Sequence, residues 1–355
     1  MEANFDLLVS GCSTRCRHCY VNGGPGRNMP LRDVLLCIEK LDELAAALLF
    51  SASMTLDNEP MLHPDVIAII RAASGTKHIK NFHHGMTTGI ALIERKDRSD
   101  VMKAYLDCGC DEFGITLHGS AAHHDELVHR RGAHAASLEA ARFMRSCGAS
   151  LSVSLMLNRF FAEDADAIDA ALNELQPDYI YFAIPNYTPH DNMPGFEPYR
   201  ASMETLLALR PRLKAWQQDE EELFKTAENG SVRAAVRQLG AGVKLRELFS
   251  APQEELYLTV HPDRRLYLGN TGAETLCLGD LKTLDIAGTA ALIARQPGNR
   301  DYGAFYDTDV LPDESELIGA LQRIPEDLLF SDMASVICRG LADMGIPTKL
   351  LKQVR

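Results

Sequence analysis

Strand-like and helix-like segments alternate along the first half of this sequence. Six apolar segments, each typical of a buried β-strand, lie at residues 5–10, 47–57, 79–89, 112–119, 150–158 and 178–186. Five amphipathic segments with apolar residues at helical spacing lie between them, at residues 30–46, 63–73, 98–109, 137–148 and 163–175. Because a helix after each strand returns the chain to the same end of a sheet, this alternation predicts a parallel sheet. We expect an α/β fold, a partial (β/α)6 TIM-like barrel, with its functional groups at the C-terminal ends of the strands.

The pattern changes after about residue 195. Residues 196–250 are charged and helical in pattern, and we expect a helical linker or insert there. Residues 254–270 are typical of a β-hairpin with its turn at Pro262, Asp263 and Arg264. Further helices are expected at residues 283–295, 315–323 and 325–344. The sequence thus predicts three segments, which are the barrel at 1–195, the insert at 196–250 and a smaller α+β module at 251–355.

The composition indicates which binding partners the protein can have and in which cellular compartment it is expected. The formal net charge is −13 and there is no basic run, which argues against a nucleic-acid partner. No window approaches roughly 18 uninterrupted apolar residues, so no membrane span is expected. The first residues show neither the basic region nor the apolar region of a signal peptide. Nine cysteines in such a chain indicate reduced thiols in the cytoplasm.

Three of those cysteines, Cys12, Cys16 and Cys19, lie together just after the first strand, in the stretch SGCSTRCRHCYVNGGPG. Thiolates are soft ligands for zinc, copper(I) or iron–sulfur clusters. This spacing can hold three corners of a 4Fe–4S cluster and leave the fourth iron open. The alternative is a zinc site completed by His18 or a distant residue, although zinc sites usually pair two cysteine knuckles and the sequence has no second one.

The stretch CSTRCRHC matches a CxxxCxxC signature and resembles the radical S-adenosylmethionine (radical SAM) superfamily. The resemblance continues in order through LDNEPMLHPD after the second strand, HGMTTG after the third and GITLHGSAAHHDELVHRRG from the fourth. It implies that Cys12, Cys16 and Cys19 bind one 4Fe–4S cluster and that S-adenosylmethionine (SAM) is the second cofactor. Asp57 and Asn58 stand where the family has glycines, so the approach of SAM to the backbone can differ here.

The same resemblance implies which residues bind SAM. Glu59, in the NEP stretch, would receive the ammonium group of SAM, and either Arg130 or Arg131 would pair with its carboxylate. The full set of expected SAM contacts is Tyr20, Asn58, Glu59, Pro60, Thr88, Thr116, Arg130, Arg131, Ser154, Asn158 and Ile184. Each of these residues could also have an ordinary structural role that involves no SAM. A Ser or Thr at a strand end often makes only a local hydrogen bond, and an Arg in a charged loop is usually solvated.

The resemblance also implies the chemistry. An electron from an external reductant, such as a flavodoxin or a ferredoxin, would reach the cluster and cleave SAM into methionine and a 5′-deoxyadenosyl radical. The radical would abstract a hydrogen atom from the substrate, while the barrel orients the reactants and excludes water. A non-catalytic iron–sulfur or zinc protein is the alternative from a different class.

The C-terminal hairpin and the residues after it resemble a SPASM or twitch extension, in which cysteines bind auxiliary iron–sulfur clusters. Beyond residue 250 this chain has only Cys277 and Cys338, too few for an ordinary cluster on thiolates alone. We therefore expect a degenerate extension without auxiliary clusters, and a hydrogen-donor role for Cys277 stays open. The remaining cysteines are expected to be structural, namely Cys37, Cys108, Cys110, Cys147 and Cys338.

Two absences favour a polar small molecule or natural-product intermediate as the substrate. These are the missing auxiliary clusters and the short stretch ahead of Cys12, which leaves no room for a leader-peptide recognition domain. Modification of a ribosomal peptide is the alternative. The stretch YFAIPNYTPHDN follows the sixth strand, and we expect Tyr187, His190 and Asp191 to contact the substrate. An ordinary polar loop would have the same composition.

Overall fold

The fold is taken from a computed structural model of the chain. The structure describes residues 2–19, 23–26, 28–187, 195–248, 250–252, 255–271, 274, 276–295, 299–301, 311–346 and 352–353.

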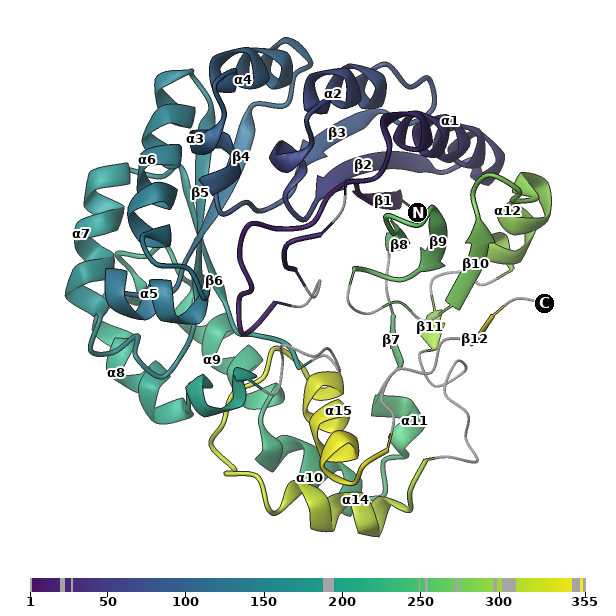
Figure 1. The fold of residues 1–355 in the computed structure, drawn as a ribbon. Coiled ribbons are helices and arrows are strands. Elements are labelled where there is room, and N and C mark those ends of the chain that lie inside the picture. The colour runs from purple at the N-terminus through teal and green to yellow at the C-terminus, as the bar shows by residue number, and fades with distance from the viewer. Residues whose placement is uncertain are drawn as a thin grey trace.

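Six parallel strands form the barrel and confirm the α/β fold expected from the sequence. The first three, β1 (Glu2–Leu8), β2 (Ser51–Asp57) and β3 (Asn81–His84), pair in that order, and so do β4 (Glu112–Leu117), β5 (Ser150–Met156) and β6 (Tyr179–Ala183). A bridge between Thr87 and Ile115 joins the two groups, and the Thr87 amide donates to the Gly114 carbonyl at 2.9 Å. The strands therefore curve into one partial barrel (Figure 1).

Helices cover the outside of this barrel (Figure 1). The long ones are α1 (Leu31–Leu48), α2 (Val66–Ser74), α4 (Arg98–Asp107), α6 (Ala133–Ser146) and α7 (Ala165–Leu175), in agreement with the five helical segments of the sequence. Three short ones were not predicted, which are η1 (Pro60–Leu62), α3 (Ile90–Glu94) and α5 (Ala121–Leu127). Each short helix follows the C-terminal end of a strand, where the loops of such folds carry their functional groups.

The strands have one apolar face and one polar face. On β1 and β2, Phe5, Leu7 and Met54 are fully buried in a core that also contains Leu41 and Leu44 of α1. Because successive side chains of a strand point to opposite faces, the alternate residues of these strands face the interior of the barrel. The interior face is polar: β1 and β2 place Asn4, Asp6, Ser53, Thr55 and Asp57 on it.

The C-terminal hairpin is part of the same sheet as the barrel. Strand β8 (Glu255–Val260) pairs in parallel with β1 over residues 2–7, and β9 (Arg265–Leu268) pairs antiparallel with β8. With β10 (Leu276–Asp280) and β12 (Lys352–Gln353), the seven-stranded sheet has the order β12-β10-β9-β8-β1-β2-β3. The sheet thus runs across the expected boundary at residue 251, and the division of the chain into three segments stays a prediction.

Apart from α12, which shares a core with the hairpin strands, the remaining helices lie away from the hairpin (Figure 1). The charged segment forms η3 (Glu197–Tyr199), α8 (Met203–Leu213), α9 (Glu220–Asn229), α10 (Val232–Gly240) and α11 (Leu245–Leu248). Helices α14 (Glu314–Leu321) and α15 (Met333–Asp343) pack with α10 around a core of their own, and α12 (Ile286–Ala294) contacts α1. Two short strands, β7 (Ser250–Pro252) and β11 (Asn299–Asp301), pair with each other.

The helix predicted at 325–344 begins only at Met333. Leu328 and Leu329 instead form isolated bridges with Ser202 and Ser231, and Asp332 caps α15 by accepting from the Ser335 amide at 2.7 Å. In the sequence, two apolar residues before a capping Asp are compatible with a helix that starts early or with an extended segment before the helix. Here the bridges to Ser202 and Ser231 keep Leu328 and Leu329 extended, and the helix starts after Asp332. Within the described residues, no helix combines the length and the apolar character that crossing a membrane requires.

Candidate active site

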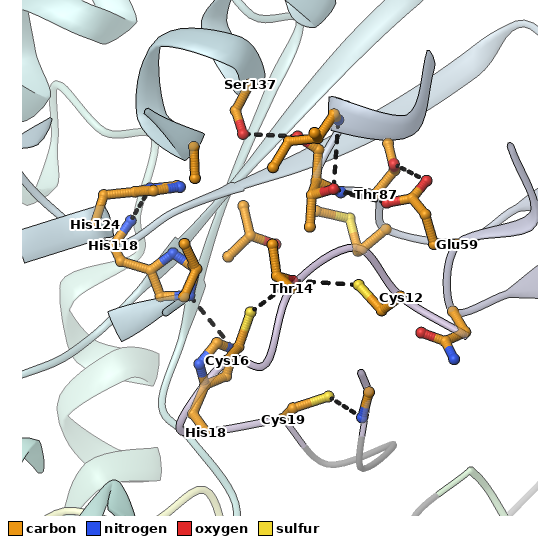
Figure 2. A pocket seen from close by; sticks show the side chains of 18 of the residues that line it. Cys12, Thr14, Cys16, His18, Cys19, Glu59, Thr87, His118, His124 and Ser137 are labelled. Carbon is orange, nitrogen blue, oxygen red and sulfur yellow. Dashed lines mark hydrogen bonds between the residues drawn. The ribbon is translucent and has the colours of Figure 1, made fainter. Parts of the chain in front are cut away.

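A cavity lies at the C-terminal ends of the barrel strands, where the fold places functional groups (Figure 2). The cavity has a volume of about 100 Å³. The loop after β1, the ends of β2 and β4, the turn after β3 and helices α5 and α6 all contribute lining residues. The site therefore collects side chains from about the first 140 residues of the chain.

All three clustered cysteines line this cavity. The Thr14 hydroxyl lies between two of them, 3.2 Å from Cys12 Sγ and 3.4 Å from Cys16 Sγ, and the Gly23 amide donates to Cys19 Sγ at 3.0 Å (Figure 2). Burial raises the pKa of Cys12 to about 11 and raises the pKa of Cys16 still further. Cys12 and Cys16 therefore hold their protons at neutral pH and release them when a metal binds.

The backbone of the cysteine loop is fixed at both ends. The Cys12 amide donates to the Gly24 carbonyl at 2.8 Å, and the Arg17 amide donates to the Leu127 carbonyl of α5 at 2.9 Å. A Cβ at Gly11 would lie 2.6 Å from the Gly26 amide nitrogen, and a Cβ at Gly23 would lie 3.0 Å from Cys19 Sγ. The glycines thus allow two backbone segments and a sulfur to pack closely.

Asn58, at the end of β2, takes a backbone conformation that glycine usually supplies. Its φ is 68°, in the left-handed region, where Asn is one of the tolerated residues. Its side-chain amide donates to the Ser10 carbonyl at 3.1 Å, and the Ser10 hydroxyl donates to the Glu59 carbonyl at 2.6 Å. The replacement of a glycine at this position is therefore compatible with a left-handed backbone at the cavity wall.

Glu59 is fully buried and lines the cavity. Its carboxylate accepts three hydrogen bonds, from the Thr87 hydroxyl at 2.6 Å, the Thr88 hydroxyl at 2.8 Å and the Thr88 amide at 3.1 Å. Burial raises the pKa of this carboxyl, and the hydrogen bonds from the two threonines oppose that rise. Glu59 thus ties β2 to the turn after β3, and its expected contact with the SAM ammonium stays a prediction.

The other residues predicted to bind SAM divide into two groups. Asn58, Thr88 and Thr116 line the cavity together with Glu59. Six others lie outside its lining, namely Pro60, Arg130, Arg131, Ser154, Asn158 and Ile184. Tyr20 lies outside the described residues.

Two of these six have hydrogen-bond or ion-pair partners within the protein, and their contact with SAM stays a prediction. Arg130 donates to the Ser13 carbonyl at 3.2 Å and forms an ion pair with Glu94, so it supports the cysteine loop from outside. Asn158 is fully buried, donates to the His118 carbonyl at 2.8 Å and accepts from the Phe160 amide at 3.0 Å. These polar groups serve the loops that border the cavity.

The residues expected to contact the substrate are not brought to the cavity wall. Tyr187 is buried against α10, α14 and α15, with the Arg339 guanidinium 6.0 Å from its ring centre. His190 and Asp191 lie outside the described residues. Among the other cysteines, Cys37 and Cys110 are buried in the main core and Cys338 packs against the core of the C-terminal helices.

Three histidines line the cavity that were not predicted to do so, His18, His118 and His124. The Nε2 atoms of His18 and His118 are 3.5 Å apart, and the His118 and His124 ring centres are 4.9 Å apart (Figure 2). Burial lowers the pKa of His18 to about 4 and that of His124 to about 3, so these imidazoles are neutral at neutral pH. The recurrence of His inside the cysteine motif and after the fourth strand was the signal available in the sequence.

Comparison with protein families identifies the domain that carries this cavity. Residues 7–171 match the model of the Radical SAM superfamily. This part of the chain belongs to the radical SAM superfamily. The match covers the three cysteines and all the cavity residues named above. No curated protein matches the chain.

Solved structures agree at the level of the fold. The chain is similar to anSMEcpe with bound AdoMet and Kp18Cys peptide, at 11% identity and a TM-score of 0.56, over 86% of this chain and 83% of that one. It is also similar to Streptococcus suis SuiB bound to S-adenosylmethionine, at 12% identity and a TM-score of 0.52, over 92% and 73%. A likeness to SuiB bound to the precursor peptide SuiA, at 14% identity and a TM-score of 0.38, covers 50% of this chain and only 38% of that one.

The donor set in the cavity fits the cofactors of radical SAM enzymes, a 4Fe–4S cluster and SAM. Three thiols face one space, none of them is in a disulfide, and a glycine beside Cys19 leaves the sulfur uncovered by a side chain. Thiolates are the usual ligands of such clusters. A buried carboxylate, two threonines and an asparagine lie on the wall beside the thiols and offer partners for the polar groups of SAM.

Proposed function

We propose that Cys12, Cys16 and Cys19 hold one 4Fe–4S cluster and that the enzyme uses SAM bound beside it to abstract a hydrogen atom from its substrate. The observation that carries the proposal is the convergence of the three thiols on one cavity of a radical SAM domain. They are also the only cysteines among the described residues that line it. Asn58, Glu59, Thr88 and Thr116 are the proposed SAM contacts, because all four line the same cavity.

The cluster and SAM, when bound, supply an electron and a carbon-centred radical. The residues of this chain position and shield that chemistry. Glu59, Thr87 and Thr88 hold the ends of β2 and β3 together through three hydrogen bonds, so the cavity wall does not have to reorganise on binding. His118 and His124 are each only 2% exposed, and they close the far side of the cavity against water.

We further propose a polar small molecule as the substrate. The polar interior face of β1 and β2 lies directly below the cavity and supports this choice, since a polar surface suits a polar ligand. An external reductant such as a flavodoxin or ferredoxin, a degenerate SPASM-like extension and a reducing compartment are parts of the same proposal. Nine cysteines support the last of these.

Modification of a peptide is the second candidate function. It is favoured by the ligands found on similar folds, because anSMEcpe carries a bound Kp18Cys peptide. The two candidate functions require different kinds of substrate binding inside the barrel. A peptide substrate would be recognised along several residues, whereas a small molecule would be held by the polar interior alone.

Anaerobic reconstitution with iron and sulfide, followed by dithionite and SAM, tests the proposal. We expect about four irons per chain, as one cluster requires, and formation of 5′-deoxyadenosine and methionine. A well-reconstituted cluster that yields neither product would contradict the enzymatic proposal. Close to eight irons per chain would contradict the assignment of a single cluster.

A further inference from the structure

Asp57, the last residue of β2, brings a second buried carboxylate to the cofactor cavity. It lines the cavity together with Glu59, and it is only 9% exposed. Asp57 stands where the superfamily motif has a glycine, so the motif itself assigns no role to this side chain. A buried carboxylate on a cavity wall needs a partner of its own.

The Asp57 carboxylate is held by uncharged groups. The Asn58 amide and the Thr271 hydroxyl donate hydrogen bonds to it. A Cβ at Gly85 would lie 2.7 Å from Asp57 Oδ1, so the glycine in the turn after β3 leaves the room that this side chain occupies. Because a carboxylate has about four acceptor positions on its two oxygens, these two donors leave lone pairs for a ligand in the cavity.

Thr271 reaches Asp57 from the C-terminal part of the sheet. It follows β9 and lies outside the residues that match the family model. Thr259 of β8 donates to the Gly269 carbonyl at 2.8 Å, and its hydroxyl oxygen is 3.5 Å from that of Thr271. Thr259 is fully buried and Thr271 is 4% exposed. The C-terminal strands thus position a buried hydroxyl against the carboxylate at the end of β2.

The cavity wall carries acids without a cation among the described residues. Its lining includes Asp57 and Glu59 and no Lys or Arg. Burial raises the pKa of both carboxyls, and only hydrogen bonds from uncharged groups oppose the rise. The lining imidazoles of His18, His118 and His124 are neutral at neutral pH, because burial lowers their pKa. A bound cation would therefore complete the electrostatics of this wall.

The arginines that support the surrounding loops do not supply this cation. Arg130 pairs with Glu94, and Arg95 pairs with Asp97. Arg15, in the cysteine loop, is exposed to solvent. None of these three side chains lines the cavity. The positive charge that suits Asp57 is thus one that a ligand brings.

SAM carries two positive groups, an ammonium and a sulfonium. Glu59 is the expected partner of the ammonium. A sulfonium has no N–H or O–H group, so it is recognised by the charge of a nearby anion and not by a hydrogen bond that it donates. The remaining lone pairs of Asp57 offer such a charge in a buried place, where it acts most strongly.

We propose that Asp57 recognises the sulfonium group of SAM and that the Thr271 hydroxyl positions the Asp57 carboxylate for this role. The inference rests on the proposed function, because it assumes that SAM occupies this cavity. It adds a second acidic contact to that function and gives the segment after β9 a part in cofactor binding. Asp57 is a binding residue and takes no part in cleavage of the C–S bond.

Binding of three ligands tests the inference without turnover. They are SAM, S-adenosylhomocysteine, in which a neutral thioether replaces the sulfonium, and sinefungin, in which a carbon with a protonated amine replaces it. Each is titrated by isothermal calorimetry into cluster-reconstituted protein without a reductant, so that SAM is not cleaved. We expect SAM and sinefungin to bind at least about tenfold more tightly than S-adenosylhomocysteine, because a contact between buried opposite charges contributes that much. Equal binding of all three would overturn the inference.

A variant of Asp57 locates the preference for the cationic ligands. Asp57→Asn keeps the shape of the side chain and loses its charge, so it should lower this preference at least about fivefold. Asp100→Asn, the same change on the exposed outside of α4, should retain it. An unchanged preference in Asp57→Asn, at the iron content and circular dichroism of the parent, would overturn the assignment.

Two further variants separate the roles of the neighbouring groups. Glu59→Gln should weaken all three ligands alike, because all three carry the ammonium that Glu59 is expected to bind. Thr271→Val removes the hydroxyl and should lower the preference by a few fold while the affinity for S-adenosylhomocysteine stays the same. A purely structural role of Thr271 would change all three affinities together and would overturn its part in the proposal. If Asp57→Asn does not load the cluster, Thr271→Val decides.

The two proposals fail in different ways. Formation of 5′-deoxyadenosine by a protein whose preference does not depend on Asp57 would reject the sulfonium contact and leave the radical SAM function intact. A preference that Asp57→Asn removes, without cleavage of SAM in the parent after reduction, would reject the enzymatic function and leave the sulfonium contact intact.

Discussion

The wall of the cofactor cavity and the interior face just below it are both polar, yet their side chains are used differently. At the cavity, the hydroxyls of Thr14, Thr87 and Thr88 all bond to cysteine sulfurs or to Glu59. One step below, Thr55 and His83 have no side-chain partner among the described residues. Threonine hydroxyls that are already paired help to preorganise the cavity for one fixed cofactor, whereas unpaired side chains take their partners from the ligand.

The difference extends to the backbone. At the cavity, glycine and left-handed asparagine allow close contacts that a Cβ or a different φ would disturb, as at Gly11 and Asn58. The interior face is built on regular parallel strands, where side chains can change without moving the backbone. We therefore expect substitutions at the cavity to alter cluster loading and stability, and substitutions on the interior face to alter the choice of substrate.

The largest expected effect is loss of the cluster from the cavity. Cys16→Ala should abolish the visible absorbance of the cluster and most of the bound iron, since two thiolates hold a 4Fe–4S cluster poorly. Cys338→Ala, in α15, should leave both unchanged and is the matched control. Loss of the cluster in the control would overturn the assignment of the three clustered cysteines as the only cluster ligands.

Gly11→Ala should disturb the cavity without removing any ligand. The new Cβ would lie 2.6 Å from the Gly26 amide nitrogen and closer still to the Gly24 carbonyl oxygen, so the backbone of the cysteine loop must move. We expect a loss of about 1–3 kcal/mol in the free energy of unfolding, as for other overpacked sites, together with lower iron incorporation. Chemical unfolding and iron analysis measure the two effects.

The control for this change is another glycine. A Cβ at Gly319 in α14 would meet no heavy atom within 4 Å, so Gly319→Ala should leave iron incorporation unchanged and the protein equally or slightly more stable. Normal cluster loading in Gly11→Ala would show that the cysteine loop adapts to the new Cβ. The cavity would then be less preorganised than its close backbone contacts suggest.

The regular part of this architecture was predictable from the sequence because its signals are local. Each barrel strand is an apolar run and each long outer helix has two or more turns of helical periodicity, so both were found. The cysteine spacing also identified one wall of the cavity. Helices α3 and α5 have only five and seven residues, too few to show a period, and they were missed.

Long-range contacts could not be predicted in the same way. The pairing of β8 with β1 joins residues about 250 apart, and no local pattern indicates which edge of a strand a distant hairpin will occupy. Arg130 was expected at SAM because of its place in the chain; its side chain donates to Ser13 and Glu94, and the contact with SAM stays a prediction. Side-chain direction after a loop depends on the neighbours that folding brings together, and these are absent from the sequence pattern.

A further effect should appear as a pH dependence of stability that arises at the far side of the cavity. Burial lowers the pKa of His124 to about 3 from an ordinary 6.5, so the unfolded chain binds a proton on this residue at a higher pH than the folded chain does. Its contribution to stability is therefore complete above about pH 6.5 and is lost as the pH falls toward 3, by up to about 1.4 kcal/mol per pH unit.

His124→Phe removes this contribution and should make the free energy of unfolding less steep in pH between about 6.5 and 4. Urea unfolding of the cluster-free protein at several pH values measures the slope for the parent and the variant. A constant offset is also expected, because the His118 amide loses its acceptor, His124 Nδ1, at 3.3 Å. Identical slopes would mean that His124 is hydrated or paired in solution, and that this side of the cavity is open to water.

The smallest effect tests whether the backbone or the side chain of Asn58 matters at the cavity. Asn58→Gly keeps the left-handed φ of 68° and loses only the hydrogen bond to the Ser10 carbonyl, so it should cost about 0.5–1.5 kcal/mol of stability. Asn58→Ala loses the same hydrogen bond and adds the strain of a Cβ in that conformation, about 1 kcal/mol more. Chemical unfolding should therefore rank the parent above the glycine variant and the glycine variant above the alanine variant. If alanine equals glycine, the conformation at position 58 is not required by the fold, and the cavity wall is held by its hydrogen bonds alone.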